Sequence, residues 1–287
     1  MTQSSAGPRT RTRGGVATAG DDRPAPPDSP VISVQGVTKR FRRKGQVVTA
    51  IQDVDLGVAS GEFVCIVGPS GCGKSTLLNM SAGLMQPSKG HLLFEGRELG
   101  GPNTKAGYIT QKDNLMPWHT VAGNIGMALS IRKMDKRKAR ARVAEMIEMV
   151  GLTGFEKSYP GELSGGMRKR VTLARTLAYD PPVLLADEPF GALDAQLKLV
   201  MQAEIQRIWA ETRKTILFVT HDISEAVALG DRVIVMSSRP GRIKVDRRID
   251  LPRPRDVFKI RHQQEFGDLA EELWDVLAAD MHSGEDM

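Results

Sequence analysis

A glycine-rich segment from Gly68 to Ser75 has the residue types and spacing of a phosphate-binding loop. It reads GPSGCGKS and fits the pattern G-x-x-x-x-G-K-[ST]. Glycines let such a loop turn its backbone amides toward phosphate oxygens at the start of a helix. Lys74 adds a positive charge for the β- and γ-phosphates, and Ser75 offers a hydroxyl to Mg²⁺. The segment predicts a nucleotide site formed by Gly68, Pro69, Ser70, Gly71, Cys72, Gly73, Lys74, Ser75 and Thr76.

Two adjacent carboxylates, Asp187 and Glu188, end a second segment that could do chemistry. They follow the apolar run Val183–Ala186. Neighbouring residues of a strand point to opposite sides, so the two side chains can serve different groups. Asp187 suits the shell of a Mg²⁺ ion. Glu188 suits the activation of a water molecule that attacks a γ-phosphate.

Apolar strands must position both segments. Phe63–Val67 precedes the glycine-rich loop, and it is apolar throughout, as in a strand buried on both faces. Two further runs of this kind, Ile216–Val219 and Val233–Met236, come after the acidic pair. Helical patterns separate these strands. Strands that alternate with helices predict an α/β fold with a largely parallel sheet covered on both faces.

Other segments predict additional elements. Shorter strands are expected at 31–34, 47–56 and 91–94, and a helical zone is expected from about Thr120 to Ala178. Within that zone Gly151 is placed to end a helix. Apolar positions at helical spacing near the C-terminus predict a final amphipathic helix, formed around Phe266, Leu269, Leu273, Val276 and Leu277.

Composition and charge argue for an ordinary cytosolic protein. The formal net charge is +6, and the dense basic run between Arg132 and Arg142 is interpreted as a solvated helix face, so no nucleic-acid partner is expected. The two cysteines, Cys65 and Cys72, do not form a metal or disulfide pattern. Arginines near the N-terminus have no apolar core after them, so they do not form a secretory signal. No apolar run approaches the roughly 18 residues that a membrane-spanning helix needs.

Further motifs occur in the order of a known family. Gln111 follows the phosphate loop, and the sequence LSGGM at Leu163–Met167 comes next. After the acidic pair come Ala192-Leu193-Asp194, and then His221 after the last strand but one. With these motifs, residues 31–243 resemble the nucleotide-binding subunit of ATP-binding cassette (ABC) transporters. The LSGGM segment discriminates most, because other phosphate-loop ATPases lack it.

The resemblance implies roles for several residues. Ser164, Gly165 and Gly166 would bind the γ-phosphate of an ATP held by a second copy, so that two ATP molecules join a homodimer head to tail. The N-terminus of a helix is suited to this because it attracts anions. His221 would contact the γ-phosphate. Gln111 would contact the metal or the attacking water, and Phe41 would stack on adenine.

Together, the motifs and the resemblance predict three sets of site residues. The catalytic set is Glu188, His221, Gln111 and Lys74. The metal set is Ser75, Gln111 and Asp187. The nucleotide set adds Phe41, Ser164, Gly165 and Gly166 to the loop residues named above. The implied cofactors are ATP and Mg²⁺.

The resemblance also implies an architecture. It is a P-loop NTPase with a mostly parallel central sheet, an antiparallel β-subdomain and a helical subdomain that carries the LSGGM segment. The expected division is a disordered tail at 1–30, an ABC-type ATPase domain at 31–245 with its helical subdomain at about 112–178, and an extension at 246–287. Two positions depart from the family. Phe41 stands where tyrosine is common, and Lys169, which is expected outside the phosphate-contacting core, stands where many members have glutamine.

The segment from Gln111 to Val121 resembles the nitrate, sulfonate and taurine import group, as does the segment from Ser238 to Ile243. This implies an importer subunit on the cytoplasmic face of the inner membrane. Its partners would be a membrane permease that contacts residues 111–121 and a substrate-binding protein that acts with the permease. Trp118 and Met116 would form the floor of an apolar groove for a short permease helix. The alternative for Trp118 is a place in the core.

Three alternatives for function stay open at this level. A soluble ABC-type ATPase could act on ribosomes or DNA, although such relatives usually carry paired cassettes or coiled-coil insertions. A phosphate-loop kinase would share the glycine-rich loop but would not explain LSGGM or His221. The ATPase of an exporter would share every catalytic motif.

Overall fold

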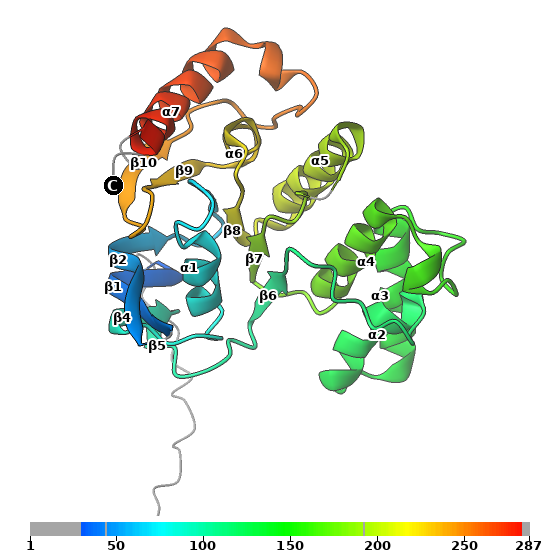
Figure 1. Cartoon of the computed structure of the whole chain (residues 1–287). Coiled ribbons are helices and arrows are strands. Elements are labelled where there is room, and N and C mark those ends of the chain that lie inside the picture. Colours follow the sequence, from blue (N-terminus) through cyan, green and yellow to red (C-terminus); the bar gives the residue numbers. More distant parts are fainter. Residues whose placement is uncertain (1–29, 44, 192, 283–287) are drawn as a thin grey trace, which may run out of the picture.

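The computed structural model describes residues 30–43, 45–191 and 193–282, arranged as two sheets and a set of helices (Figure 1). Nearly all of the predicted tail at 1–30, and Ala192 of the predicted Ala192-Leu193-Asp194 motif, lie outside these residues. Within the described part of the chain, no helix is long and apolar enough to cross a bilayer.

The larger sheet has six strands in the order β10-β9-β3-β8-β7-β6. Its pairs are parallel except for β9 with β10. Every residue of β3, β7 and β8 is buried, which explains why these strands contain continuous apolar runs rather than alternating polar and apolar residues. The strands are β3 (Phe63–Val67), β6 (Ala106–Ile109), β7 (Val183–Asp187), β8 (Thr215–Val219), β9 (Arg232–Met236) and β10 (Ile243–Arg248).

The smaller sheet is antiparallel, with the order β2-β1-β4-β5. It consists of β1 (Ile32–Arg43), β2 (Gln46–Val58), β4 (Lys89–Phe94) and β5 (Arg97–Glu98). The two sheets share a core with helix α1 (Lys74–Ser81), in which Val64 and Ile66 of β3 meet Leu77 and Leu78 of α1. The glycine-rich loop is therefore fixed at both ends by buried elements, a strand before it and a helix after it.

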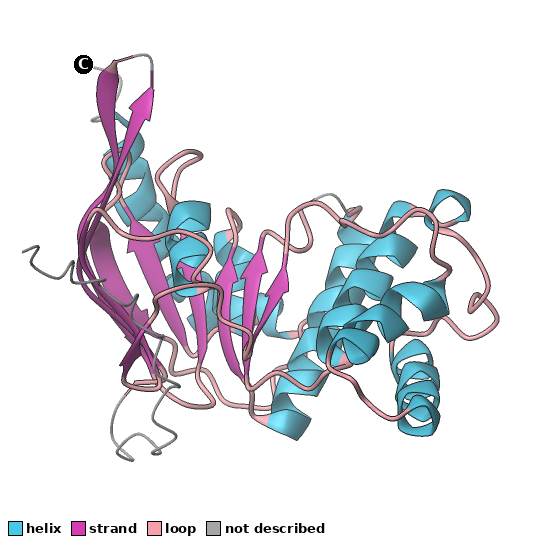
Figure 2. Ribbon diagram, turned by 90° about the horizontal axis from the view of Figure 1, so that it is seen from below, coloured by secondary structure: helices cyan, strands magenta, loops and turns pink. Residues whose placement is uncertain are grey.

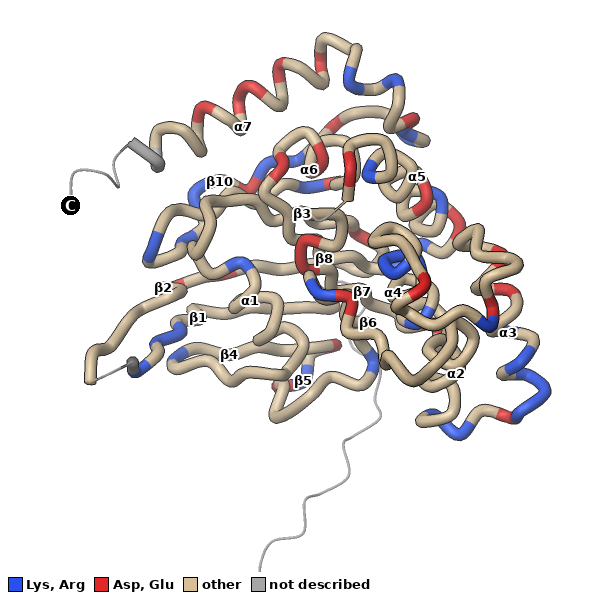
Figure 3. The backbone as a smooth tube through the Cα atoms, turned by 45° about the vertical axis from the view of Figure 1, so that its right-hand side comes forward, with Lys and Arg blue, Asp and Glu red and all other residues tan. Residues whose placement is uncertain are grey.

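A helical subdomain lies beside the β6 and β7 edge of the larger sheet (Figure 1), and Figure 2 shows the same helices at one end of that sheet. It contains α2 (Val121–Ile131), α3 (Lys136–Met149), a short 3₁₀ turn (Pro160–Glu162) and α4 (Gly165–Leu177). Side chains of Thr120, Asp135 and Ser164 cap the three helices by accepting backbone N–H bonds. Gly151 follows α3 with a φ of +65°, as its sequence position predicts. The basic run between residues 132 and 142 lies mostly exposed along α3 and the turn before it (Figure 3).

Helices α5 (Ala195–Thr212), α6 (Ile223–Leu229) and α7 (Gln264–His282) cover the face of the larger sheet opposite to the face that packs on α1 and the smaller sheet. On α7, the apolar residues Phe266, Leu273 and Leu277 are buried in the main core cluster, so the predicted amphipathic helix packs on the rest of the fold. A 3₁₀ turn (Ile260–His262) leads into it. Two sheets and a helical subdomain confirm the predicted fold class. The sequence pattern did not predict β5, β6 and β10, because β5 and β6 are very short and β10 is mostly charged.

Candidate active site

The predicted site residues gather at the carboxyl ends of the parallel strands. The glycine-rich loop follows β3, Gln111 follows β6 after one residue, and Glu188 follows β7 directly. His221 lies two residues beyond β8. Because the carboxyl ends of parallel strands share one edge of a sheet, residues far apart in sequence meet there.

The glycine-rich loop needs glycine at Gly73. This residue has a φ of +107°, and a Cβ there would lie 2.7 Å from Cγ1 of Ile51 and 3.1 Å from the carbonyl oxygen of Ala50. It stands directly before α1, so the amides of the first turn open toward the loop. Lys74 is 5% exposed, and its Nζ donates to the carbonyl oxygens of Gly68 at 2.7 Å and Pro69 at 2.9 Å. The loop therefore holds the ammonium group against itself.

Ser75 and Asp187 form the second part of the site. The Ser75 hydroxyl donates to Oδ1 of Asp187 at 2.9 Å. Burial raises the pKa of Asp187 and Glu188 adds to the rise, while the hydrogen bond from Ser75 and the charge of Lys74 oppose it. A hydroxyl beside a carboxylate is a set of hard oxygen ligands, which fits Mg²⁺ bound together with a phosphate. The pair could hold that ion. Within the described residues, no cluster of three or more His, Cys, Asp or Glu side chains offers a separate metal site.

Glu188 is the point where three strand ends meet. Its Oε2 accepts a hydrogen bond from Nε2 of Gln111 at 3.3 Å and lies 3.4 Å from Nδ1 of His221. The backbone of Glu188 has a φ of +44°, which is uncommon for a residue with a side chain. Asp187 contacts the loop helix, whereas Glu188 faces Gln111 and His221. The adjacent carboxylates thus have separate sets of neighbours.

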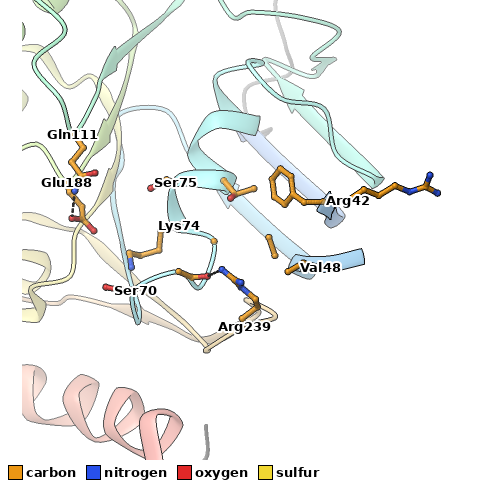
Figure 4. Close-up of a pocket in the computed structure, with 13 residues that line it drawn as sticks. Arg42, Val48, Ser70, Lys74, Ser75, Gln111, Glu188 and Arg239 are labelled. Atoms are coloured by element: carbon orange, nitrogen blue, oxygen red, sulfur yellow. Dashed lines mark hydrogen bonds between the residues drawn. The ribbon is translucent and has the colours of Figure 1, made fainter. Parts of the chain in front are cut away.

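A pocket of about 610 Å³ joins these groups to the smaller sheet (Figure 4). Its walls bring together Lys74 and Glu188 with Phe41 and Val48, which face each other across β1 and β2. The Phe41 ring is 36% exposed, and Nζ of Lys39 lies 5.4 Å from its centroid. An exposed aromatic ring at one end and a phosphate loop at the other match the two ends of a nucleotide. The predicted residues that line the pocket are Phe41, Ser70, Gly71, Gly73, Lys74, Ser75, Thr76, Gln111 and Glu188.

The pocket wall also contains Arg239, which no sequence motif predicted as a site residue. This residue follows β9, and its Nη2 donates to the carbonyl oxygen of Gly71 at 3.2 Å. It belongs to the segment Ser238–Ile243, whose resemblance to a transporter group was noted only as a family marker. The position of this segment at the end of an apolar strand could have signalled a place in the site, since every other such strand end supplies a site residue.

Arg239→Ala is expected to weaken binding of ATP and of ADP by roughly fivefold, which corresponds to about 1 kcal/mol for an exposed charge contact. The reason is that the guanidinium flanks Gly71 and so reaches the part of the pocket that both nucleotides would occupy. Calorimetric titration of each nucleotide checks this. Arg242→Ala, a neighbouring exposed arginine outside the pocket, should leave both affinities unchanged. Equal affinities for Arg239→Ala and wild type would contradict the expectation.

The LSGGM segment is not part of this pocket. Ser164 and Gly165 are exposed, Gly166 is buried, and none of them is among the residues that line it. Ser164 caps α4 by accepting from the amide of Met167 at 3.3 Å. Figure 1 shows α4 and α1 on opposite sides of β6 and β7. Within one chain, the structure therefore does not bring the two predicted phosphate-binding helix starts into one pocket.

Comparison with known proteins identifies the family of this chain. Residues 51–191 match the family model described as ABC transporter. An uncharacterized ABC transporter ATP-binding protein of Methanocaldococcus jannaschii is 47% identical over 229 residues, which is 80% of this chain and 86% of that protein. The aliphatic sulfonates import ATP-binding protein SsuB of Bacillus cereus is 45% identical over 224 residues, which is 78% of this chain and 88% of that protein. The taurine import ATP-binding protein TauB of Roseobacter denitrificans is 41% identical over 266 residues, which is 89% of this chain and 98% of that protein.

A solved structure is also similar. It is the dimeric, post-hydrolysis state of an ATP-binding cassette bound to ADP and Pi, and it is 32% identical to this chain with a TM-score of 0.70. The match covers 77% of this chain and 100% of the solved one. The phosphate loop, the acidic pair and the LSGGM helix lie on a fold that both sequence and structure relate to ATP-binding cassettes. The chain therefore belongs to the ABC transporter family, as one of its ATP-binding, ATP-hydrolysing proteins.

Proposed function

We propose that two copies of this chain bind two ATP molecules head to tail and drive the uptake of a small anionic solute through a separate permease. The observation that carries the proposal is that the pocket of one chain lacks the predicted phosphate-binding residues of the LSGGM segment. Lys74, Gln111 and Glu188 line it, whereas Ser164 caps a helix elsewhere on the surface of the same chain. A second copy can supply that helix start. The dimeric assemblies of the similar solved cassettes support this arrangement.

The described contacts suggest how the site works. Backbone amides of the glycine-rich loop and the ammonium group of Lys74 would hold the phosphates. Ser75 and Asp187 would hold Mg²⁺, which supplies positive charge to the phosphate oxygens. Glu188 would accept a proton from the attacking water. Gln111 and His221 would orient its carboxylate through Oε2. Phe41 would stack on the adenine ring at the far end of the pocket.

The direction of transport is argued from the relatives. Two of the similar proteins are named as import ATP-binding proteins for aliphatic sulfonates and for taurine. We assign this chain to the same class, with nitrate, a sulfonate or taurine as the solute and a substrate-binding protein that delivers it. The chain would work at the cytoplasmic face of the membrane. Neither the relatives nor the site favours the ribosomal, DNA, kinase or export alternatives.

We infer that the permease binds an apolar groove of about 620 Å³ between α2 and α3, rather than a floor formed by Trp118 and Met116. Trp118 is 68% exposed, so it is not a core residue, yet neither Trp118 nor Met116 lines the groove. Small and apolar residues line the groove, among them Gly126, which has no side chain, and Val143, which lies next to it. His119 lines the groove, and the centroid of its ring lies 6.4 Å from that of the Trp118 ring. We place a short permease helix in this groove, with Trp118 beside it.

The proposal is tested by measuring the uptake of labelled taurine, methanesulfonate and nitrate. The cells are a deletion strain of the source organism in which the gene for this chain has been removed. We expect the deletion strain to lose uptake of at least one of these solutes. Expression of the wild-type chain should restore that uptake, whereas expression of the Glu188→Gln variant should not. Gly126→Leu should fail as well, because it fills the groove, although its purified form keeps ATPase activity within about twofold of wild type. A side chain at this helical glycine adds helix propensity, so we expect it to fold.

Ala141→Leu is the matched control, because Ala141 lies exposed on α3 outside the groove. It should restore uptake. Unchanged uptake of all three solutes in the deletion strain would show that the solute class is wrong, and accumulation of a solute in that strain would indicate export. Full uptake with Gly126→Leu would exclude the groove as the permease site.

A further inference from the structure

Lys169 is a buried cation on the helix that carries the LSGGM segment. It is 4% exposed and lies five residues after Ser164 on α4, about 7.5 Å along the helix axis. A buried ammonium group is costly unless polar groups surround it. Its partners therefore indicate why the residue is there, although the family more often has glutamine at this position.

The partners of Lys169 are the backbone at Gln111 and its neighbours. Nζ donates to the carbonyl oxygens of Gln111 and, at 3.3 Å, of Thr110. It also lies 3.2 Å from Oδ1 of Asp113, close enough for an ion pair but without the alignment of a hydrogen bond. The lysine thus binds the main chain of the residue whose side chain bonds to Glu188 at 3.3 Å.

Other residues of α4 hold the next part of the same segment. Arg175 donates to the carbonyl oxygens of Asp113 at 3.1 Å and Asn114 at 2.8 Å, and the Thr172 hydroxyl donates to that of Asp113 at 3.1 Å. Arg168 bonds to the Asp113 carboxylate at 3.3 Å. These bonds would stay in place without Lys169. Loss of the Lys169 amine would remove its hydrogen bonds from α4 to Gln111 and Thr110, together with its ion pair to Asp113, which Arg168 also contacts.

We infer that Lys169 is a positioning residue that couples the two ATP sites of the dimer. This inference rests on the head-to-tail dimer proposed above. Ser164, at the start of α4, would bind the γ-phosphate held by the other copy, while Gln111 belongs to the pocket of this copy. One rigid helix then joins both, so closure on one nucleotide moves Gln111, and through it Glu188, at the other site. Coupling of this kind makes ATP hydrolysis cooperative.

Three variants separate the link from general stability. Lys169→Met keeps a similar length but has no donor, Lys169→Gln keeps donors on a shorter stem, and Lys169→Arg keeps both donors and charge. We expect Lys169→Met to lower kcat about tenfold with KM for ATP within about twofold, because a misplaced group costs rate more than binding. Its Hill coefficient for ATP should fall from a wild-type value above one to about one. Lys169→Arg should restore both quantities, and Lys169→Gln should restore them in part.

Arg175→Met is the matched control, because it removes two bonds between the same helix and the same segment but none to Gln111. It should keep the wild-type Hill coefficient even if its thermal midpoint falls. The inference is overturned if Lys169→Met keeps wild-type kcat and cooperativity, or if Arg175→Met loses cooperativity to the same extent. A wild-type Hill coefficient of one in a chain that dimerises on ATP would also overturn it, while leaving the dimer intact. Failure of wild type to dimerise on ATP would instead remove the proposed dimer, and the coupling with it.

Discussion

Glu188→Gln is expected to lower ATP hydrolysis by about 10²- to 10⁴-fold, which is the usual contribution of a positioned general base. Glutamine has nearly the same shape but cannot accept the proton of the attacking water. The amide can still occupy the place of the carboxylate next to Gln111 and His221. We therefore expect ATP binding to persist, and the variant to remain as an ATP-bound dimer because the step that would open the dimer is blocked.

Two measurements check this expectation. Release of phosphate gives the rate, and light scattering during gel filtration gives the mass of the protein with ATP and with ADP. Glu211→Gln is a suitable control, because Glu211 is an exposed residue of α5 that pairs only with Arg207 among the described side chains. It should hydrolyse ATP and dissociate as wild type does. Hydrolysis by Glu188→Gln at the wild-type rate would exclude Glu188 as the base.

Lys74→Ala and Ser164→Asp are each expected to be inactive alone and to regain activity when mixed. Lys74→Ala removes the ammonium group that the glycine-rich loop holds against its carbonyl oxygens, and a loss of at least about a hundredfold in hydrolysis is expected. Ser164→Asp keeps a good helix cap but places a negative charge where the γ-phosphate of the other copy would lie. The protein should still fold and bind ATP, but the closed dimer should not form.

A mixed dimer contains one site with both defects and one site with none. If pairing is random, half of the dimers are mixed, so activity returns to roughly a quarter of wild type at most, and to less where the two sites need each other. Co-purification of two differently tagged variants measures how many mixed dimers form. Thr120→Asp, a change of cap on α2 away from the pocket, is the control and should stay active. Recovered activity would require a site built from two chains, and mixed dimers as inactive as either variant alone would contradict the expectation that one intact site hydrolyses ATP.

Both experiments depend on residues whose roles the sequence suggested one at a time. The glycine-rich loop could be predicted because its chemistry is local, since Gly73, Lys74 and Ser75 are neighbours in the chain and their geometry follows from a strand, a turn and a helix. The fold class followed in the same way from apolar runs that alternate with helices. Ser164 as a helix cap is also local, because the bond it accepts comes from a residue three positions later.

Contacts between strand ends could not be predicted in this way. The meeting of Gln111 and His221 at one oxygen of Glu188 requires β6, β7 and β8 to be neighbours, and the long helical segments that separate these strands in the sequence leave their pairing undetermined. Arg239 enters the pocket because β9 lies beside β3. Trp118 and Met116 were expected at the floor of an apolar groove, whereas the packing of α2 on α3 forms an apolar groove that neither residue lines.

The sequence alone therefore determined the phosphate loop, the acidic pair, the class of fold and the family, because each is written in short stretches whose conformation depends on near neighbours. Only the tertiary structure decided which side chains share a pocket, that Lys169 joins the LSGGM helix to Gln111, and that the LSGGM segment lies outside the pocket of its own chain. The physical reason is that a few ångströms across a sheet or between two helices correspond to tens of residues along the chain. Such distances are set by the packing of all the elements at once.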